Sequence, residues 1–269
     1  MSADESERAG PAPGDTVQTL AKGLAVIEAF TAEHPAMTLS EVARRTGVSR
    51  AAARRLLLTL VELGYAGTDG RLFSLRPRVL DLGFAYLHST GIWNLAQPFM
   101  VELVEQVHES CSAAVLDGAD IVYVARVPTQ TRIMSVSLGL GSRLPAHLTS
   151  MGRVLLAALD DAALDDAIRR LGPLQRHTEH TITDPARLAE EIRRVRAQGY
   201  ALLDQELEAG LRSLAVPILG ANEAVVAALN VGTQASRTSI ERLLGEILPL
   251  LRHTATRIGQ ALGARARPA

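Results

Sequence analysis

The chain has 269 residues, a formal net charge of −1, 47% hydrophobic residues and 21% charged residues, which is typical of a soluble protein with one large or two modest domains. Its single cysteine, Cys111, excludes an internal disulfide and a metal site built from several thiolates. No apolar run approaches the roughly 20 residues that span a bilayer. The acidic, proline-rich segment 1–15 lacks the apolar core of a signal peptide, so we expect a disordered tail on a cytoplasmic protein with no membrane partner.

An amphipathic helix is predicted to follow this tail. Leu20, Leu24, Ile27 and Phe30 recur at a spacing of three to four residues, which places them on one face of a helix. Pro35 cannot continue a helix and ends the pattern.

A short second helix and a longer third helix are predicted next. Thr38 and Glu41 have the spacing of a capping box, in which each side chain satisfies a free backbone donor at the helix start. Gly47 suits a left-handed end to this helix, and Ser49 can cap the third helix, which Gly64 closes. The predicted buried face of the third helix consists of Ala53, Leu56, Leu57, Leu60 and Leu63.

The stretch YAGTDGRLFSL then predicts a β-hairpin, because Asp69-Gly70 favours a two-residue type I′ turn. A helix, a short helix, a turn, a third helix and a hairpin, in that order, form a winged helix-turn-helix domain, which we assign to residues 16–76. A linker helix is predicted over residues 77–92.

Positive charge is concentrated on this first domain. Residues 16–92 contain nine basic and six acidic side chains, although the whole chain is close to neutral. The second helix of a helix-turn-helix enters the major groove of DNA, where arginine binds guanine through two N–H groups. We therefore predict binding to double-stranded DNA, and the alternative is a basic helix face that only meets water. The predicted DNA-binding residues are Arg50, Ala51 and Arg54 as base readers, Ala52 as a small residue that with Ala51 lets the helix approach the groove, Arg44, Arg45, Arg55 and Arg71 as phosphate contacts, and the capping residues Thr38 and Ser49.

The remaining sequence predicts a second domain over residues 93–262, with a flexible tail over 263–269. Strands interleave with helices in it, so the chain as a whole is of the α+β class. The predicted helices cover residues 93–110, 150–159, 161–171, 185–198 and 239–262. The predicted strands lie in 112–128 (two strands joined at 117–120), in 132–152 together with a glycine-rich loop, and in 212–219 and 224–233.

Four arginines of this second domain, Arg126, Arg132, Arg143 and Arg212, lie in or beside apolar segments, where a charge must find an anion. Because the planar guanidinium suits a carboxylate, a small carboxylate ligand is one candidate. An internal partner, such as Asp204, Glu206 or Glu208, is the other candidate.

An enzyme is the alternative to a ligand sensor. His147 and Ser150 are three residues apart and could act as base and nucleophile on a small acyl or carboxylate substrate, with the helical domain as an accessory. However, TSMG lacks the nucleophile elbow, and Ser150 can simply cap a helix. His177 and His180 lack a third ligand, and Cys111 fits a small buried hydrophobe. We predict a protein that is not an enzyme, with no catalytic residue, metal site or cofactor.

The stretches TLSEVARRTGVSRAAARRLLLTLVELGYAG, SRLPAHLTSMGRVLLA, GYALLDQELEAGLRSLAVPI and AALNVGTQASR resemble the IclR (isocitrate lyase regulator) family. The resemblance covers residues 16–262 and is greatest to regulators of protocatechuate, 4-hydroxybenzoate and β-ketoadipate catabolism. It implies a winged helix joined to a GAF-like α/β domain, a homodimer or dimer of dimers, a pseudo-palindromic operator, and a small carboxylate effector that is aromatic or derived from ring cleavage.

The same resemblance implies where the effector binds. The family pattern places its pocket at the loop before a helix, at the segment after GY and at the last strand. Some relatives have serine in the last strand, where this chain has Asn230 and Gly232. The implied effector-binding residues are Arg143, Leu144, Pro145, His147, Thr149, Ser150, Met151, Asp204, Ser213, Asn230 and Gly232.

Overall fold

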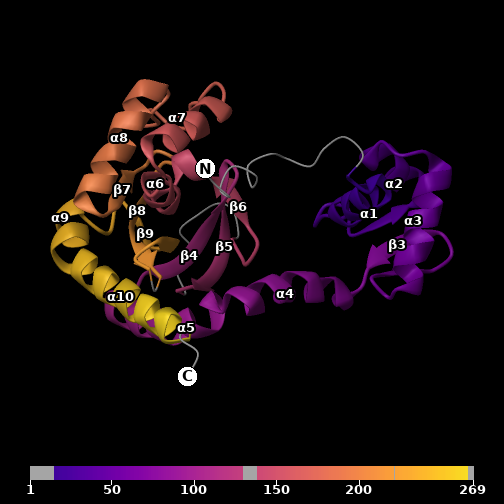
Figure 1. The fold of residues 1–269 in the computed structure, drawn as a ribbon, viewed down its shortest axis with the longest axis horizontal. Coiled ribbons are helices and arrows are strands. Elements are labelled where there is room, and N and C mark those ends of the chain that lie inside the picture. The colour runs from indigo at the N-terminus through magenta and orange to yellow at the C-terminus, as the bar shows by residue number, and fades with distance from the viewer. Residues whose placement is uncertain (1–14, 130–137, 221, 266–269) are drawn as a thin grey trace, which may run out of the picture. The chain divides into compact units, whose positions relative to one another are not determined.

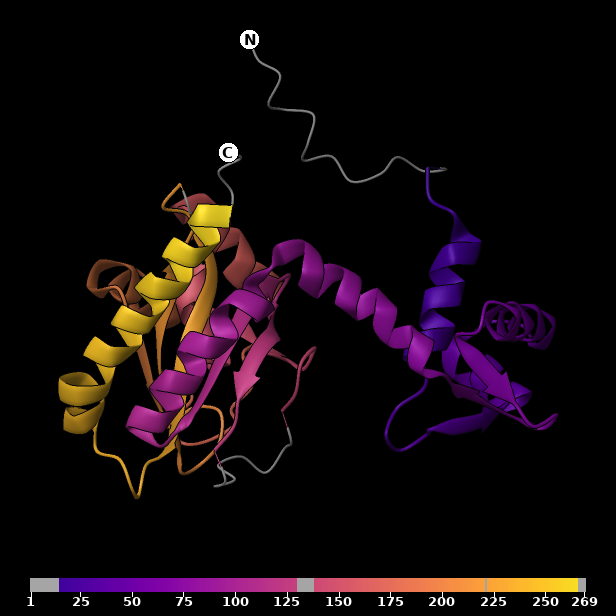
Figure 2. The ribbon, with the colours of Figure 1, turned by 90° about the horizontal axis from the view of Figure 1, so that it is seen from below.

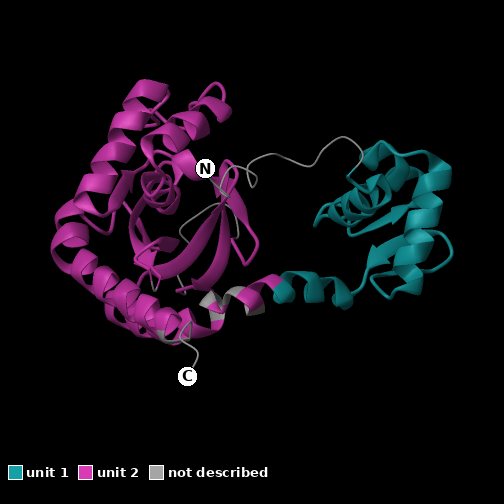
Figure 3. Ribbon diagram, viewed as in Figure 1, with its two compact units in different colours: residues 1–85 teal, residues 86–269 magenta. Residues whose placement is uncertain are grey.

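The computed structural model describes residues 15–129, 138–220 and 222–265. Its contacts divide the chain into two compact units, with the division between Ala85 and Tyr86 (Figure 3). This division falls inside helix α4 (Leu80–Thr90), within the segment predicted as a linker. In the described part of the chain, no helix has the length and apolar character needed to cross a membrane.

The first unit contains three helices and a small antiparallel sheet. The sheet has the strand order β1-β3-β2, so the hairpin of β2 and β3 is extended by a strand that the sequence did not predict. The elements are α1 (Gln18–Glu28), β1 (Ala36–Thr38), α2 (Leu39–Thr46), α3 (Arg50–Glu62), β2 (Ala66–Thr68) and β3 (Leu72–Leu75). This is the predicted order of a winged helix-turn-helix.

The helix boundaries of this unit follow from local side-chain chemistry. The Glu41 amide donates to Thr38 Oγ1 at 3.4 Å, and the Thr38 amide donates to Glu41 Oε2 at 2.7 Å, which confirms the capping box. Gly47 ends α2 with a φ of 68°, a conformation that costs glycine little. The Ala52 amide donates to Ser49 Oγ at 3.2 Å, so Ser49 caps α3 as predicted.

Two predictions for this unit are wrong. The sequence predicts Leu63 on the buried face of α3, but this residue follows the helix and is 50% exposed, whereas Leu57 and Leu60 are buried. The register pairs Thr68 with Phe73, so Gly70 and Arg71 are the central turn residues. Of these two, Gly70 alone has a positive φ, whereas a type I′ turn needs positive φ at both.

The second unit is built on one six-stranded sheet with the order β6-β5-β4-β9-β8-β7, in which every neighbouring pair is antiparallel. Its strands are β4 (Ser110–Asp117), β5 (Asp120–Val127), β6 (Arg143–Pro145), β7 (Ala201–Asp204), β8 (Leu211–Leu219) and β9 (Val225–Gln234). Strand β7 was not predicted. The strand expected within 132–152 begins in a segment outside the described residues, and β6 is the part of it that the structure describes.

Helices cover both faces of this sheet (Figures 1 and 2). Helices α5 and α10 pack together on one face, while α6 packs on the other face, with α7 and α8 against it. The helices are α5 (Ile92–Val107), α6 (Ser150–Ala157), α7 (Asp161–Arg170), α8 (Pro185–Gln198), α9 (Ile240–Arg242) and α10 (Leu248–Arg265). This unit also has a short 3₁₀ turn at Ala146–Leu148 and a π-helical turn at Leu243–Ile247, and a further 3₁₀ turn at Pro77–Val79 precedes α4 in the first unit.

The sheet separates two apolar cores. Along β8, Leu214 and Val216 pack toward α5 and α10, while Ala215 packs toward α6. This alternation is the period of two that a strand imposes on its side chains. All eight residues of α6 are buried, because the helix lies between the sheet and the outer helices.

Candidate DNA-binding and effector-binding sites

The candidate DNA-binding surface is formed by α2, α3 and the hairpin of the first unit. Arg44 and Arg45 are exposed in the last turn of α2, and Arg71 is exposed in the hairpin turn. On α3, Arg50 and Arg54 are exposed one turn apart. Arg55 and Ala51 are also exposed, whereas Ala52 is half-buried.

The remaining two predicted DNA-binding residues, Thr38 and Ser49, have structural roles in this surface. The Thr38 hydroxyl donates to Glu41 Oε2 at 2.8 Å and accepts from the Glu41 amide, so it holds the first turn of α2. Ser49 does the same for α3, where its hydroxyl accepts from the Ala52 amide. Both residues therefore fix the start of a helix that carries exposed arginines.

The arginines of the two units differ in how their charge is balanced. Ion pairs between described residues all lie in the second unit, where eleven arginines have a carboxylate partner within 4.0 Å. The six predicted DNA-binding arginines form none with a described residue. Their exposed guanidinium groups are available for an external anion such as phosphate.

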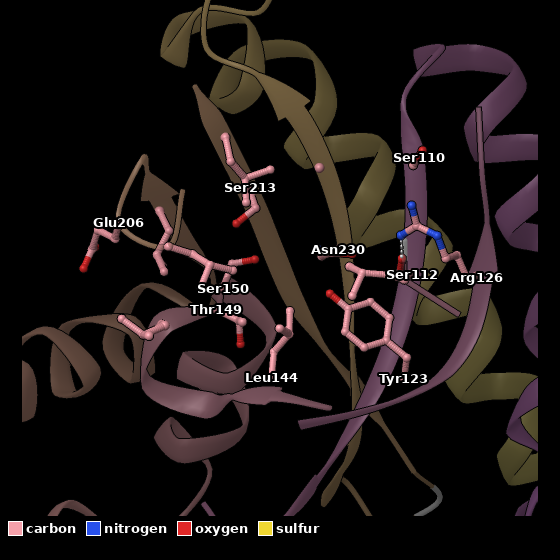
Figure 4. A pocket seen from close by; sticks show the side chains of 16 residues that line it. Ser110, Ser112, Tyr123, Arg126, Leu144, Thr149, Ser150, Glu206, Ser213 and Asn230 are labelled. Atoms are coloured by element: carbon pink, nitrogen blue, oxygen red, sulfur yellow. Dashed lines mark hydrogen bonds between the residues drawn. The ribbon is translucent and has the colours of Figure 1, made fainter. Parts of the chain in front are cut away.

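A pocket lies at one end of the six-stranded sheet, beside the first turn of α6 (Figure 4). The register brings its polar residues together, since Ser110 pairs with Gly232 across β4 and β9, and Gly232 pairs with Ser213 on β8. The lining consists of Ser110, Ser112, Tyr123, Arg126, Leu138, Leu144, Leu148, Thr149, Ser150, Leu203, Glu206, Leu207, Leu211, Ser213, Asn230 and Gly232.

Arg126 is the cation that lines this pocket. Its Nη1 donates to Ser112 Oγ at 3.1 Å, and the dashed line in Figure 4 marks this bond. Among the described residues, no carboxylate forms an ion pair with it. Burial raises the pKa of the neighbouring Tyr123 to about 12, and the charge of Arg126 opposes this shift. Of the three singled-out arginines that the structure describes, Arg126 lines the pocket and forms no ion pair with a described acid.

The other singled-out arginines have different surroundings. Arg212 makes a two-point contact with Asp204, through Nε at 2.8 Å and Nη2 at 3.0 Å, and this lowers the pKa of Asp204. Arg143 pairs on the surface with Asp117 at 2.7 Å and Asp120 at 3.2 Å. Arg132 lies outside the described residues. Arg212 and Arg143 therefore bind acidic residues of the same unit rather than needing a ligand anion.

A buried ion pair supports the pocket wall. Arg153 of α6 is 1% exposed, and its Nη1 donates to Glu206 Oε1 at 2.8 Å while its Nη2 donates to Oε2 at 2.5 Å. Arg153 Nε also donates to the carbonyl of His147 at 3.0 Å. Arg153 therefore connects α6 and the turn before it to the loop after β7. The ion pair also neutralises the charge of Glu206, the acid that lines the pocket.

The structure brings six of the eleven implied effector-binding residues into the pocket lining: Leu144, Thr149, Ser150, Ser213, Asn230 and Gly232. The other five lie outside it. Arg143 and Asp204 are engaged in the ion pairs above, and Met151 is fully buried in the core between α6 and the sheet. Pro145 and His147 are half-buried beside the pocket.

The sequence interpretation missed several lining residues. The sequence predicts a helix as far as Ser110 and a strand from Ser112, whereas in the structure both serines lie at alternate positions of β4 and so on one face of the sheet. Arg126 was recognised as a charge in an apolar strand but was not assigned to the site. Glu206 was considered only as an internal partner, and Leu203, Leu207 and Leu211 carry no sequence signal that separates them from core residues.

The candidate catalytic pair lacks the geometry of a nucleophile and its base. The Ser150 hydroxyl and His147 Nδ1 are both buried, and neither has a hydrogen-bond partner among the described residues. Thr149, rather than Ser150, caps α6, because its hydroxyl accepts from the Gly152 amide at 3.0 Å. Burial, aided by the charge of Arg153, lowers the pKa of His147 to about 4. Cys111 is fully buried in β4, which raises the pKa of its thiol.

Two family models match the chain. The IclR helix-turn-helix domain matches residues 19–70. The model described as bacterial transcriptional regulator IclR C-terminal matches residues 84–260. Together these matches cover most of both compact units.

Individual proteins are similar over nearly the whole chain. The Pca regulon regulatory protein of Pseudomonas putida is 48% identical over 237 residues, which are 88% of this chain and 81% of that protein. A crystal structure from Rhodococcus sp. RHA1, described as a transcriptional regulator, is 54% identical with a TM-score of 0.83 and covers 93% of this chain and 100% of that one. An IclR homolog from Microbacterium hydrocarbonoxydans, crystallised with 4-hydroxybenzoate, is 27% identical with a TM-score of 0.80 and covers 91% of this chain and 99% of that one.

Proposed function

Because the chain belongs to the IclR family of bacterial transcriptional regulators, we propose that it binds an operator through its first unit and a small carboxylate through its second. Similarity to a regulator of the Pca regulon and to a homolog crystallised with 4-hydroxybenzoate supports a role in aromatic-acid catabolism. The effector is then an aromatic acid or a product of ring cleavage, sensed in the cytoplasm where the DNA lies.

The observation that supports DNA binding is that the exposed arginines of α2, α3 and the hairpin turn form no ion pair with a described residue. In this proposal α3 enters the major groove, where Arg50 and Arg54 contact base edges and Ala51 approaches a thymine methyl group. Arg44, Arg45, Arg55 and Arg71 contact phosphates, which adds affinity without sequence information.

We propose a homodimer, or a dimer of dimers, that covers exposed apolar residues and reads a pseudo-palindromic operator. Val17, which precedes α1, and Leu20 and Leu24 on α1 are 68%, 64% and 46% exposed, and on α4 Leu80 and Leu82 are 61% and 47% exposed. Clustered exposed apolar side chains favour a protein interface. A two-fold dimer presents two copies of α3 to two half-sites.

Arg126 supports carboxylate binding in the second unit. A guanidinium group in a partly apolar pocket needs an anion, and it binds a carboxylate through two parallel N–H bonds. The effector changes DNA binding only if its affinity differs between the two arrangements of the DNA-binding pair.

A gel-shift titration tests the base-reading assignment. Arg50→Ala and Arg54→Ala should each weaken operator binding by about tenfold, since a two-point contact to a base contributes roughly 1–3 kcal/mol of discrimination. Arg187→Ala is the matched control, because Arg187 is an exposed arginine of α8 in the second unit. Unchanged operator affinity in both first-unit variants would contradict the assignment.

A further inference from the structure

Arg78 connects the start of the linker helix α4 to the end of helix α3. It lies in the 3₁₀ turn that leads directly into α4. Its Nη1 donates to the carbonyl of Leu63, the residue that follows α3, at 2.8 Å. Its guanidinium also lies over the ring of Tyr65, 5.2 Å from the ring centroid. One side chain therefore contacts the end of α3 at two points, while its backbone begins the linker.

The contact uses a carbonyl that the end of α3 leaves available. Gly64 follows the helix with a φ of 80°, and the amides of Gly64 and Tyr65 donate to carbonyls in the last turn of α3. This is the Schellman motif, and it does not use the carbonyl of Leu63, to which Arg78 donates. A Cβ atom at Gly64 would lie 3.4 Å from Arg78 Nη1, so glycine also leaves room for the guanidinium.

The backbone before Arg78 is held on the same residues. The Arg76 amide donates to the Tyr65 carbonyl at 2.8 Å, and Pro77 restricts the backbone at the start of the 3₁₀ turn. The Arg76 side chain lies close to Gly67 of β2, where a Cβ atom would be 2.9 Å from Arg76 Nε. The segment between the hairpin and α4 is therefore fixed on the residues that follow α3.

The first turns of α4 have no apolar interface that could replace this joint. Residues 80–86 are all exposed, with Leu80 at 61% and Leu82 at 47%. A Cβ atom at Gly83 would meet no atom within 4 Å. Figure 3 shows the start of α4 projecting from the rest of the first unit. The joint at Arg78, rather than packing of α4 itself, thus holds the linker on this unit.

We propose that Arg78 is a positioning residue that makes the linker helix and α3 move as one body. The inference rests on the proposed function, in which two copies of α3 in a dimer read two half-sites. The distance between these two copies then depends on the joint between α3 and the linker. A loose joint lowers the effective concentration of the second α3 at its half-site, and it leaves the contacts of each α3 with bases unchanged.

The second unit contains a joint of the same construction, which supplies a matched control. There α8 ends at Gln198, and Gly199 follows with a φ of 75°. Arg252 of α10 donates through Nη2 to the Gln198 carbonyl at 2.9 Å and lies 5.6 Å from the ring centroid of Tyr200. Arg252→Met therefore removes the same charge, carbonyl contact and ring contact as Arg78→Met, but outside the first unit and the linker.

DNA binding by the full chain to two duplexes tests the inference. One duplex is a site with two half-sites that the parent chain selects from random sequence, and in the other an unrelated sequence replaces one half-site. Arg78→Met should weaken binding to the first duplex by about tenfold or more and leave binding to the second within about twofold of the parent. Its dependence on salt should equal that of the parent, whereas loss of a phosphate contact lowers the slope by about one. Arg252→Met should bind both duplexes as the parent does.

The outcomes separate this inference from the proposed function. Parent-like binding of Arg78→Met to both duplexes would overturn the inference and leave the proposed function standing. Equal weakening on both duplexes, a lower salt slope, or the same loss in Arg252→Met would also overturn it, because Arg78 would then contact DNA itself or only stabilise the fold. A parent chain that binds no DNA, or that binds both duplexes equally, would contradict the proposed reading of two half-sites and the inference with it.

Discussion

Single arginines of this chain have three distinct kinds of surroundings, which decide what each can bind. Arg153 is buried and binds both oxygens of Glu206, so it is part of the architecture. Arg126 has a serine but no described carboxylate within reach, so it remains able to bind a ligand anion. Arg50 is exposed and unpaired among the described residues, as a DNA contact requires. The residue type alone does not separate these roles, because they depend on contacts distant in sequence.

The half-buried side chain of His147 should make the free energy of unfolding depend on pH. The pKa of His147 is lowered from 6.5 to about 4. Burial is the largest cause of this shift, and the charge of Arg153 is the second. Between these values the unfolded chain binds a proton at this position and the folded chain does not, so stability falls as pH decreases from 6.5 toward 4. Urea unfolding at several pH values should show this decrease.

The His147→Gln variant isolates the contribution of this residue. Glutamine is polar and does not titrate, so the variant should lose less stability than the parent chain between pH 6.5 and pH 4.5. Other groups whose pKa differs from its usual value, such as Asp204 and Glu109, titrate equally in both proteins and cancel in the comparison. Parallel pH profiles for the two proteins would show that His147 is free to protonate in the folded state.

At the scale of elements, the sequence predicted long helices and their caps better than short strands and turns. Thr38 and Ser49 could be recognised as caps because the bonds they form lie within three residues. Strands β1 and β7 have three and four residues and are defined by partners far along the chain, so no local pattern identified them. The hairpin turn lies one residue later than predicted, because the register pairs Phe73 with Thr68.

The pocket was predictable only in part for the same reason. Its loop and helix-start residues were available from family resemblance, but Ser110, Ser112 and Arg126 enter it through the pairing of β4 with β5 and β9. That register depends on tertiary contacts. A sequence pattern can show that Arg126 needs an anion without showing which side chains surround it.

Gly152 lies where α6 packs closely against the turn that precedes it. A Cβ atom at this position would lie 2.0 Å from the backbone oxygen of Ala146, a contact that no side-chain movement can relieve. Gly152→Ala should therefore destabilise the second unit by several kcal/mol, in the range of overpacked or strained sites. Thermal unfolding measures this loss.

Gly245 provides the matched comparison for that substitution. It also lies in a helical segment of the second unit, but a Cβ atom there would meet no atom within 4 Å. Gly245→Ala should leave the melting temperature unchanged or raise it slightly, because alanine loses less backbone entropy than glycine on folding. Equal effects of the two substitutions would mean that α6 can shift away from the turn.

For the whole molecule, positive charge is divided unequally between the two units. The first unit and linker carry nine basic and six acidic residues between positions 16 and 92, although the chain as a whole is at −1. In the second unit arginines mostly bind carboxylates of the same unit, as Arg193 and Arg194 do with Asp165 and Glu191. A near-neutral protein can therefore present one surface of uncompensated positive charge.

This division predicts which arginines control the salt dependence of DNA binding. Each phosphate contact releases counterions, so removing one lowers the slope of log affinity against log salt concentration by about one. Arg44→Gln and Arg45→Gln should each reduce the slope and weaken specific and nonspecific DNA alike, as phosphate contacts do. Arg193→Gln and Arg194→Gln change the net charge equally and should leave the slope unchanged, because their partners already neutralise them. If all four substitutions change the slope alike, overall charge rather than the surface of α2 and α3 determines the attraction to DNA.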